Sequence, residues 1–162
     1  MMTRRLLLTS TAIGMLGPFV RSGWSSALAA TGFEVTRSDA EWRRLLTPAQ
    51  YAVLRREGTE PAFASSLLHE DRTGVFACVG CARELFSSTT KYDSHTGWPS
   101  FWAPLPNAVG TTGDTSYGMS RTAVHCSRCG GHLGHVFNDG PQPTGLRYCM
   151  NGVAMIFKPG AA

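Results

Sequence analysis

The sequence predicts a small, mostly β domain with two short helices at its N-terminal side and a bound metal as a staple. Eighteen glycines and nine prolines break the chain into short extended segments, most visibly from residue 74 onward, as in a turn-rich β fold. Two capped segments with an apolar stripe precede that region. Two Cys-x-x-Cys pairs, well separated in the sequence, have the spacing of a four-thiolate zinc site.

Residues 1–30 have the plan of an export signal. Arg4 and Arg5 come first, a moderately apolar run covers residues 6–20, and Ala-Leu-Ala at residues 27–29 supplies a small-residue cleavage site. Paired arginines favour the twin-arginine route. A membrane anchor would need about 20 apolar residues, more than this run offers. We therefore expect an exported, periplasmic protein.

The rest of the chain, residues 31–162, is expected to form a single domain that is close to neutral. The whole chain carries a net charge of +4 from fifteen basic and eleven acidic residues. Arg4, Arg5 and Arg21 lie in the signal, so twelve basic residues face eleven acidic ones in the domain. A nucleic-acid surface needs a basic excess, so we expect none. We also expect no membrane span after signal removal, and a monomer.

The first helix is expected to begin at a capping box, with Ser38 as N-cap and Glu41 three residues later. Trp42, Leu45 and Leu46 give it an apolar stripe that should cover the core.

The second helix is expected to begin at Thr47, with Pro48 in its first turn. It should run to about Glu57, where Gly58 ends it. Neither helix carries a residue suited to chemistry.

Short β segments are expected in the remainder of the chain, separated by glycine and proline turns. The candidates are residues 75–78, 108–110, 122–126, 135–137 and 147–157.

Four of the five cysteines are candidate zinc ligands: Cys78, Cys81, Cys126 and Cys129. Four thiolates saturate a tetrahedral Zn²⁺ ion and leave no position for a substrate, so the metal would be structural. In an oxidising compartment the same pairs could form disulfides instead. Twin-arginine export carries folded proteins, which would allow zinc to be loaded before export.

Cys149 remains as a candidate nucleophile. Arg147, Cys149 and Asn151 alternate along an expected strand, so their side chains should share one face. A guanidinium beside a thiol favours the reactive thiolate, and Asn151 can orient its neighbours. The alternative is an inert, buried cysteine.

Two further clusters could contribute to a site. His132, His135 and Asp139 follow the second cysteine pair; a histidine there can act as a general acid, and Asp139 either caps a turn or holds a histidine tautomer. The bland alternative is a pair of surface histidines. Residues 97–102 (Gly-Trp-Pro-Ser-Phe-Trp) form an aromatic loop that is either core or the wall of a pocket for a thioether methyl group.

Taken together, these motifs resemble those of the methionine-R-sulfoxide reductases, the B-type family. The matching segments are Cys-Val-Gly-Cys, Gly-Trp-Pro-Ser-Phe, the run from Cys126 to Pro141, and Gly-Leu-Arg-Tyr-Cys-Met-Asn. They occur in the family's order and cover roughly residues 39–158. The resemblance implies two small antiparallel sheets, helices at the N-terminal side and one structural zinc ion remote from the active site.

The resemblance also implies residue roles. Cys149 would attack the sulfur of methionine-R-sulfoxide, free or in proteins, and become a sulfenic acid. His135 would donate the proton to the sulfoxide oxygen, supported by His132 and Asp139. Residues that shape the site or receive the substrate complete the set: Arg147, Asn151, Trp98 and Phe137.

One position departs from the commonest family pattern. Many members have a second redox cysteine directly before Gly-Trp-Pro-Ser-Phe, where this chain has Thr96. We therefore expect a one-cysteine cycle, in which a thioredoxin-like protein or another external thiol reduces Cys149.

Two other functions are compatible with parts of the sequence. A non-catalytic zinc-stapled β domain would keep the cysteine pairs and the aromatic loop but has no use for the cluster around Cys149. A dithiol oxidoreductase would use a Cys-x-x-Cys pair as its redox centre, and would require a βαβ context that this sequence lacks.

Overall fold

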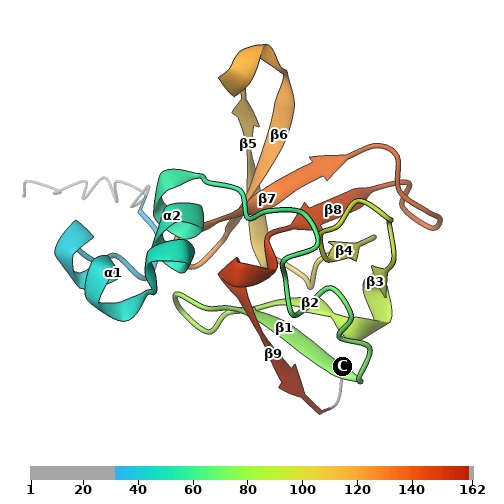
Figure 1. The fold of residues 1–162 in the computed structure, drawn as a ribbon, viewed down its shortest axis with the longest axis horizontal. Coiled ribbons are helices and arrows are strands. Elements are labelled where there is room, and N and C mark those ends of the chain that lie inside the picture. The colour runs from blue at the N-terminus through green and yellow to red at the C-terminus, as the bar shows by residue number, and fades with distance from the viewer. Residues whose placement is uncertain (1–31, 161–162) are drawn as a thin grey trace, which may run out of the picture. The chain divides into compact units, whose positions relative to one another are not determined.

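The computed structural model describes residues 32–160, and the expected export signal at residues 1–30 lies outside them. The described residues form a mostly β fold with two helices and two antiparallel sheets, which confirms the predicted fold class (Figure 1). Within this part of the chain, no helix has the length and apolar character needed to cross a membrane.

Both helices begin at the predicted residues because their caps are local in the sequence. In α1 (Asp39–Leu45) and α2 (Pro48–Arg56), the N-cap hydroxyls of Ser38 and Thr47 accept hydrogen bonds from the backbone three residues on, and both capping boxes are closed. The predicted stripe of α1 was wrong at one position. Leu45 is exposed, whereas Trp42 and Leu46 are buried in the core.

The strands form two sheets whose neighbours are all antiparallel. The smaller sheet has the order β2 (Glu84–Ser87), β1 (Gly74–Cys78) and β9 (Met155–Pro159). The larger sheet has the order β3 (Lys91–Tyr92), β4 (Ser100–Phe101), β8 (Arg147–Met150), β7 (His132–Phe137), β6 (Arg121–Cys126) and β5 (Val109–Asp114). Short 3₁₀ helices occupy Ser88–Thr90, Ser116–Gly118 and Gly152–Ala154. The hairpin of β5 and β6 extends away from the other strands (Figure 1).

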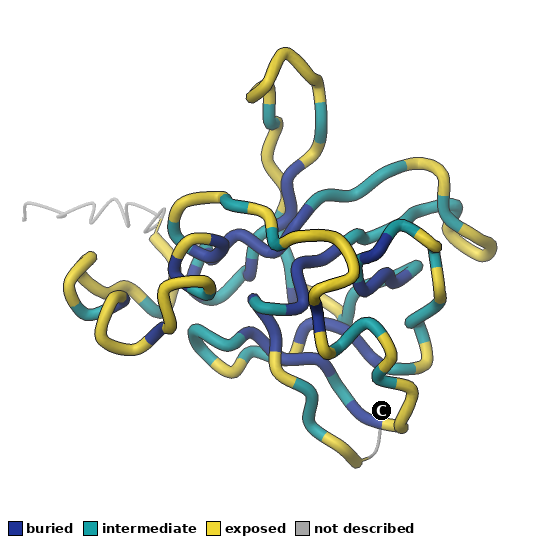
Figure 2. The backbone as a smooth tube through the Cα atoms, in the orientation of Figure 1, coloured by how far each residue is buried: buried dark blue, intermediate teal, exposed yellow. Residues whose placement is uncertain are grey.

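The core lies where aromatic side chains of the two sheets meet. Phe101 of β4 stacks on Phe86 of β2, with ring centroids 4.4 Å apart, and receives the ring of Phe76 of β1 edge-on at 5.0 Å. All three side chains are fully buried. Buried residues concentrate in the strands, and exposed ones in the loops and the hairpin tip (Figure 2). Aromatic contacts of this kind each add about 0.5–1.5 kcal/mol beyond burial.

The expected strand at residues 147–157 is in fact two strands that belong to different sheets. The 3₁₀ turn at Gly152–Ala154 separates β8 from β9. A Cβ atom at Gly152 would lie 1.7 Å from the hydroxyl oxygen of Ser65, so a larger residue at this bend would require the Ser65 side chain to move. The chain therefore leaves one sheet directly after Asn151 and enters the other.

The structure contains three strands that the sequence analysis did not predict, and two predicted strands are longer than expected. β2, β3 and β4 have only two to four residues, too few to show an alternation pattern. β4 lies within the aromatic loop, so Phe101 is core while Trp98, before the strand, is half-buried. β5 continues to Asp114 and β7 starts at His132, beyond the expected segments, because strand pairing rather than local sequence sets their length.

Candidate active site

Cys149 lies on an interior strand of the larger sheet and faces a small cavity. Antiparallel pairing places Ser100 of β4 and His135 of β7 directly opposite it, and His135 in turn lies opposite Ala123 of β6. Paired residues project on the same face of a sheet, so this row brings the thiol beside an imidazole. The cavity has a volume of about 150 Å³. Its lining residues are Thr59, Trp98, Arg121, Gly134, His135, Phe137, Cys149 and Asn151.

Gly134 allows β7 to lie close against β8 at the nucleophile. A Cβ atom there would lie 2.1 Å from the carbonyl oxygen of Cys149 and 3.0 Å from Cα of Met150. Any larger residue would push the two strands apart, so glycine at this position sets the depth of the cavity beside the thiol.

A chain of hydroxyl groups ends at the thiol. Oγ1 of Thr96 lies 3.7 Å from Sγ of Cys149, and Oγ of Ser94 lies 2.8 Å from Thr96 and 2.7 Å from Oγ of Ser100. Ser100 donates to the carbonyl of Trp98 at 3.2 Å. Ser100 therefore accepts from Ser94 and Ser94 from Thr96, which leaves Thr96 as acceptor for the thiol proton. If the direction of these hydrogen bonds is reversed, the Thr96 hydroxyl donates to the thiolate.

Arg147 and Asp139 form an ion pair beside the cavity. The guanidinium donates to both carboxylate oxygens of Asp139, at 2.9 and 2.7 Å, and stacks 4.4 Å from the ring centroid of Phe137. Hydrogen bonding to Arg147 lowers the pKa of Asp139. The structure thus joins Asp139 to Arg147 and not to a histidine, so its carboxylate orients the guanidinium.

His135 hydrogen-bonds a carboxylate from the projecting hairpin instead. Its Nε2 lies 2.7 Å from Oδ2 of Asp114, and Nη2 of Arg121 lies 2.6 Å from the same oxygen. Sequence reasoning missed both Asp114 and Arg121. The only signal that could have found them is strand register, because Asp114 pairs with Arg121 and Arg121 stands two residues before Ala123, the partner of His135.

His132 is almost fully buried behind His135. Its ring is 4% exposed and meets the ring of His135 edge-on, with centroids 5.3 Å apart. Burial lowers the pKa of His132 to about 4, so this imidazole is neutral at neutral pH. Its Nε2 has no hydrogen-bond partner among the described residues.

Asn151 ties the end of the nucleophile strand to its surroundings. Its buried amide donates to the carbonyl of Leu133 at 3.0 Å and accepts from the backbone N–H of Glu60 at 2.9 Å. The carbonyl of Glu60 accepts from Nε1 of Trp98 at 3.0 Å. One side chain thereby holds the loop that supports the cavity's tryptophan.

Glu60 is a third residue that sequence reasoning missed. Its carboxylate accepts hydrogen bonds from the backbone N–H groups of Gly152 and Val153, the latter at 3.1 Å, at the start of the 3₁₀ turn after Asn151. Burial raises the pKa of Glu60, against the effect of these hydrogen bonds. Nothing in the sequence around Glu60 indicates this long-range contact.

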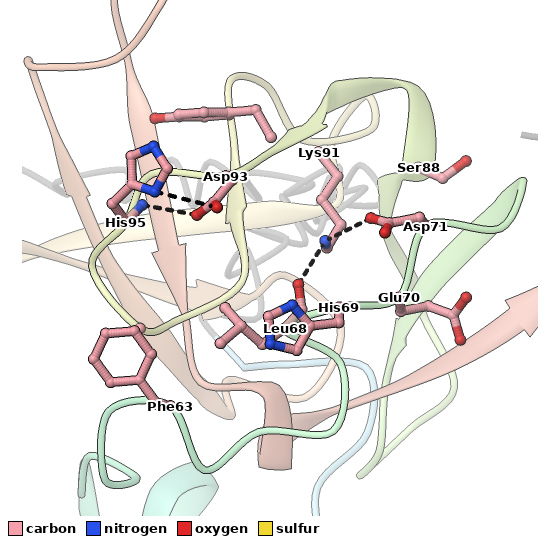
Figure 3. Close-up of a pocket in the computed structure, with 11 residues that line it drawn as sticks. Phe63, Leu68, His69, Glu70, Asp71, Ser88, Lys91, Asp93 and His95 are labelled. Atoms are coloured by element: carbon pink, nitrogen blue, oxygen red, sulfur yellow. Dashed lines mark hydrogen bonds and ion pairs between the residues drawn. The ribbon is translucent and has the colours of Figure 1, made fainter.

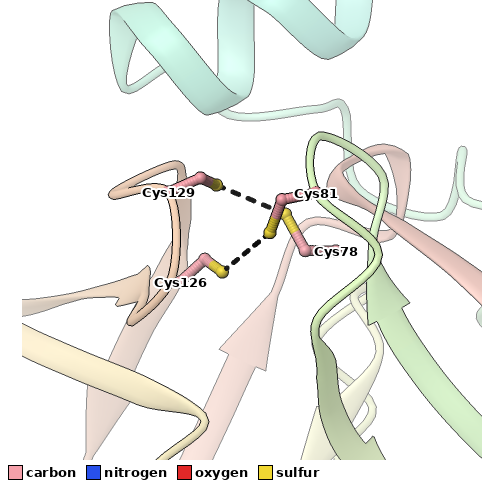
Figure 4. A group of neighbouring side chains, drawn as sticks. All are labelled: Cys78, Cys81, Cys126 and Cys129. Atoms are coloured by element: carbon pink, nitrogen blue, oxygen red, sulfur yellow. Dashed lines mark hydrogen bonds between the residues drawn. The ribbon is translucent and has the colours of Figure 1, made fainter. Parts of the chain in front are cut away.

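The other four cysteines gather where turns of the two sheets meet (Figure 4). Cys78 and Cys126 are the last residues of β1 and β6, and Cys81 and Cys129 lie in the turns that follow; the four sulfurs lie within 4.8 Å of one another. Two cross-pair distances are 3.8 and 3.5 Å. Zn–S bonds of about 2.3 Å in a tetrahedron separate the sulfurs by about 3.8 Å. The four thiols are free of disulfides, so this donor set fits one metal ion.

A larger cavity of about 610 Å³ lies between the loop near Leu68 and the loop near His95 (Figure 3). Cys149 is not among its lining residues. Lys91 donates to the carbonyl of Leu68 at 2.9 Å and lies 3.6 Å from Asp71, while His95 pairs with Asp93. Because Cys149 lines the smaller cavity and not this one, the smaller cavity is the candidate active site.

Comparison with known proteins shows the family of the chain. The family model described as SelR domain matches residues 46–159. The chain is 52% identical over 127 residues to the peptide methionine sulfoxide reductase MsrB of Leptospira interrogans serovar Lai, covering 78% of this chain and 97% of that protein. It is 50% identical over 130 residues to the MsrB of Agrobacterium fabrum, covering 80% and 96%, and 54% identical over 129 residues to that of Leifsonia xyli, covering 78% and 93%.

Proposed function

The chain belongs to the SelR-domain family of methionine-R-sulfoxide reductases, and we propose that it reduces the R epimer of methionine sulfoxide, free or in proteins, through Cys149. The observation that carries this proposal is the cross-strand pairing of Cys149 with His135 at the wall of one small cavity. A thiol and a proton donor side by side are what sulfoxide reduction requires.

In the first step the Cys149 thiolate attacks the sulfoxide sulfur. A sulfoxide oxygen leaves only when protonated, and His135 supplies that proton. The attack forms a bond between the Cys149 sulfur and the substrate sulfur. This bond and the substrate S–O bond then break as the protonated oxygen passes to the Cys149 sulfur. The substrate sulfur is reduced to a thioether, Cys149 is oxidised to a sulfenic acid, and the sulfenic oxygen keeps the proton that His135 supplied.

The neighbours of Cys149 prepare it for this step. Arg147, on the same strand two residues away, places a positive charge near the Cys149 sulfur, and Asp139 fixes the guanidinium through two hydrogen bonds. Trp98 and Phe137 line the cavity and offer an apolar wall to the substrate methyl group. His132 supports His135 by edge-on ring contact.

Recycling of Cys149 uses an external thiol. The described sulfurs other than Cys149 all belong to cysteines of the metal-binding cluster or to methionines, and Thr96 occupies the position of the usual resolving cysteine. One external thiol condenses with the sulfenic acid and releases water, and a second thiol then frees Cys149 as the mixed disulfide is reduced. A thioredoxin-like dithiol supplies both sulfurs.

The cysteine cluster is a structural zinc site in this proposal. Cys78, Cys81, Cys126 and Cys129 would hold one Zn²⁺, and a bound metal of this type adds folding free energy. The cluster joins a turn of the smaller sheet to a turn of the larger one and contributes no residue to the Cys149 cavity.

The export signal remains part of the proposal on sequence grounds, with the twin-arginine route and a periplasmic location. When Arg4 and Arg5 are replaced by lysine, export should fail, and cell fractionation should find active, zinc-loaded enzyme in the cytoplasm. Unchanged secretion would contradict the route. The expected monomer is tested by light scattering on the mature protein.

The deciding experiment uses separated R and S epimers of methionine sulfoxide with dithiothreitol as reductant. Wild type should reduce only the R epimer, and Cys149→Ser should be inactive. Activity that survives in Cys149→Ser would move the chemistry elsewhere. Inactivity of zinc-loaded wild type would favour the alternative, a ligand-binding zinc β domain.

A further inference from the structure

Asp114 holds His135 from a different part of the chain. Its carboxylate oxygen Oδ2 lies 2.7 Å from Nε2 of His135. We infer that Asp114 is a positioning residue for His135, which fixes a proton on Nε2 and makes Nδ1 the nitrogen that exchanges a proton with the sulfoxide oxygen. The inference rests on the proposed role of His135 as proton donor and adds the group that selects its reacting nitrogen.

The tautomer follows from the chemistry of the partner. An ionised carboxylate can only accept a hydrogen bond, so the ring nitrogen facing Asp114 must carry a proton. In neutral His135 the lone pair then resides on Nδ1, and in the imidazolium the proton on Nδ1 is the one free to leave.

The charge on Asp114 is secured by its own neighbours. The backbone N–H of Ser116 donates to Oδ1 at 2.8 Å, and Arg121 donates to Oδ2 at 2.6 Å. Hydrogen bonds from Ser116, with a further contribution from His135, hold the pKa of Asp114 well below its usual range. The side chains of Asp114 and His135 are only 14% and 12% exposed, so solvent weakens their contact little.

The position of the His135 ring supports the same assignment. His135 lines both the Cys149 cavity and a second cavity of about 330 Å³, and Asp114 lines only the second. The Nε2 edge is therefore turned toward the β5–β6 hairpin, and the rest of the ring is available to the Cys149 cavity.

The other ionisable groups near His135 do not compete for this role. Arg121 of β6 is positive, His132 of β7 is neutral, and Cys149 lies opposite on β8. Glu57, after α2, borders the second cavity. Among the described side chains, Asp114 is the one that hydrogen-bonds the ring of His135.

The test compares wild type with Asp114→Asn and Asp114→Glu. Sulfenic acid formation on Cys149 is followed in single turnovers of methionine-R-sulfoxide across the pH range, and the His135 tautomer is read from two-bond ¹H–¹⁵N imidazole spectra of the resting enzyme. Asp39→Asn on α1 is the matched control, because Asp39 is also paired with an arginine, Arg43, at 2.7 Å.

Asp114→Asn should slow sulfenic acid formation by about 10- to 100-fold, the loss seen when the outer hydrogen-bond partner of a metal-bound histidine is removed. Its imidazole spectrum should lose the uniform Nε2–H tautomer. Asp114→Glu should recover part of both properties, and Asp39→Asn should match wild type. Zinc content and thermal unfolding of each variant verify that the domain remains folded.

Two results would overturn the inference. One is a wild-type tautomer with the proton on Nδ1. The other is an Asp114→Asn variant that loses activity only in proportion to its loss of stability, with an unchanged His135 tautomer. Failure of the proposed function would look different, since wild type would then form no sulfenic acid while the tautomer spectra still report on Asp114.

Discussion

The hydroxyl oxygen of Thr96 lies 3.7 Å from the sulfur of Cys149, at the end of a hydroxyl chain through Ser94 and Ser100. A group on residue 96 is thus within reach of whatever forms on the Cys149 sulfur. In this chain the group is a hydroxyl, which can hydrogen-bond a sulfenic acid but cannot displace its oxygen.

Thr96→Cys should convert the enzyme to an internally resolved cycle. Only a small movement is needed to bring a sulfur at position 96 to the disulfide distance of about 2.05 Å from Cys149. After one turnover without reductant, wild type should react with dimedone at Cys149, whereas Thr96→Cys should give a Cys149 disulfide peptide in non-reducing mass spectra.

Ser94→Cys is the matched control, because it places a thiol one step farther along the same hydroxyl chain. It should leave Cys149 open to dimedone. Dimedone labelling of Thr96→Cys equal to that of wild type would show that the loop cannot deliver the second sulfur.

Arg147→Lys should reduce the reactivity of Cys149. Lysine cannot reproduce the two parallel hydrogen bonds to Asp139 or the stacking on Phe137, so its charge would not be fixed beside the thiol. We expect alkylation by iodoacetamide at pH 7 and single-turnover reduction both to slow by about tenfold or more. A tenfold change in rate corresponds to about 1.4 kcal/mol of activation free energy. Arg72→Lys, which breaks a similar pair with Glu70 away from Cys149, should alkylate at the wild-type rate.

Cys126→Ser should remove the metal and destabilise the fold. Loss of a structural metal belongs to the few changes that cost more than about 4 kcal/mol. Zinc per chain should fall from one toward zero, and the denaturant midpoint should fall with it. Cys149→Ser makes the same chemical change outside the cluster and should keep both zinc and stability. Equal stability of the two variants would contradict a structural role for the metal.

Glu60→Gln should change how stability depends on pH. Because burial raises the pKa of Glu60 above 4.5 in the folded protein, the folded state binds its proton more tightly than the unfolded state. Wild type therefore gains stability from this group below about pH 4.5 and loses it as the pH rises through the folded pKa. The stability of wild type relative to Glu60→Gln should fall over that window in urea titrations.

Glu84→Gln removes a carboxylate from an exposed position of β2 and is the control, because the decline that depends on Glu60 should remain in this variant. If the difference in unfolding free energy between wild type and Glu60→Gln did not change with pH, Glu60 would have the same pKa in the folded and unfolded states.

Local signals predicted most of the fold and the contents of the site. The helix caps at Ser38 and Thr47, the two cysteine turns and the position of Cys149 on a strand all depend on residues close in sequence. The bend at Gly152 was missed because the residues that contact it, Ser65 and Glu60, lie far away along the chain.

The partner of the proposed proton donor could not be predicted, for the same reason. Asp139, only four residues from His135, was the natural candidate, but Arg147 binds it. Asp114 reaches His135 through the register of three strands, and a one-residue slip would turn its side chain to the other face.

The order of strands in the larger sheet has a consequence for synthesis. β8 lies between β4 and β7, and both of these strands precede it in the chain. During translation the two parts of the larger sheet, β3–β4 and β5–β7, are therefore not connected until β8 is made. The strand that closes the sheet also carries Cys149. A nascent chain therefore has no finished cavity around a reactive thiol until this last insertion, and the appearance of activity reports that the larger sheet is complete.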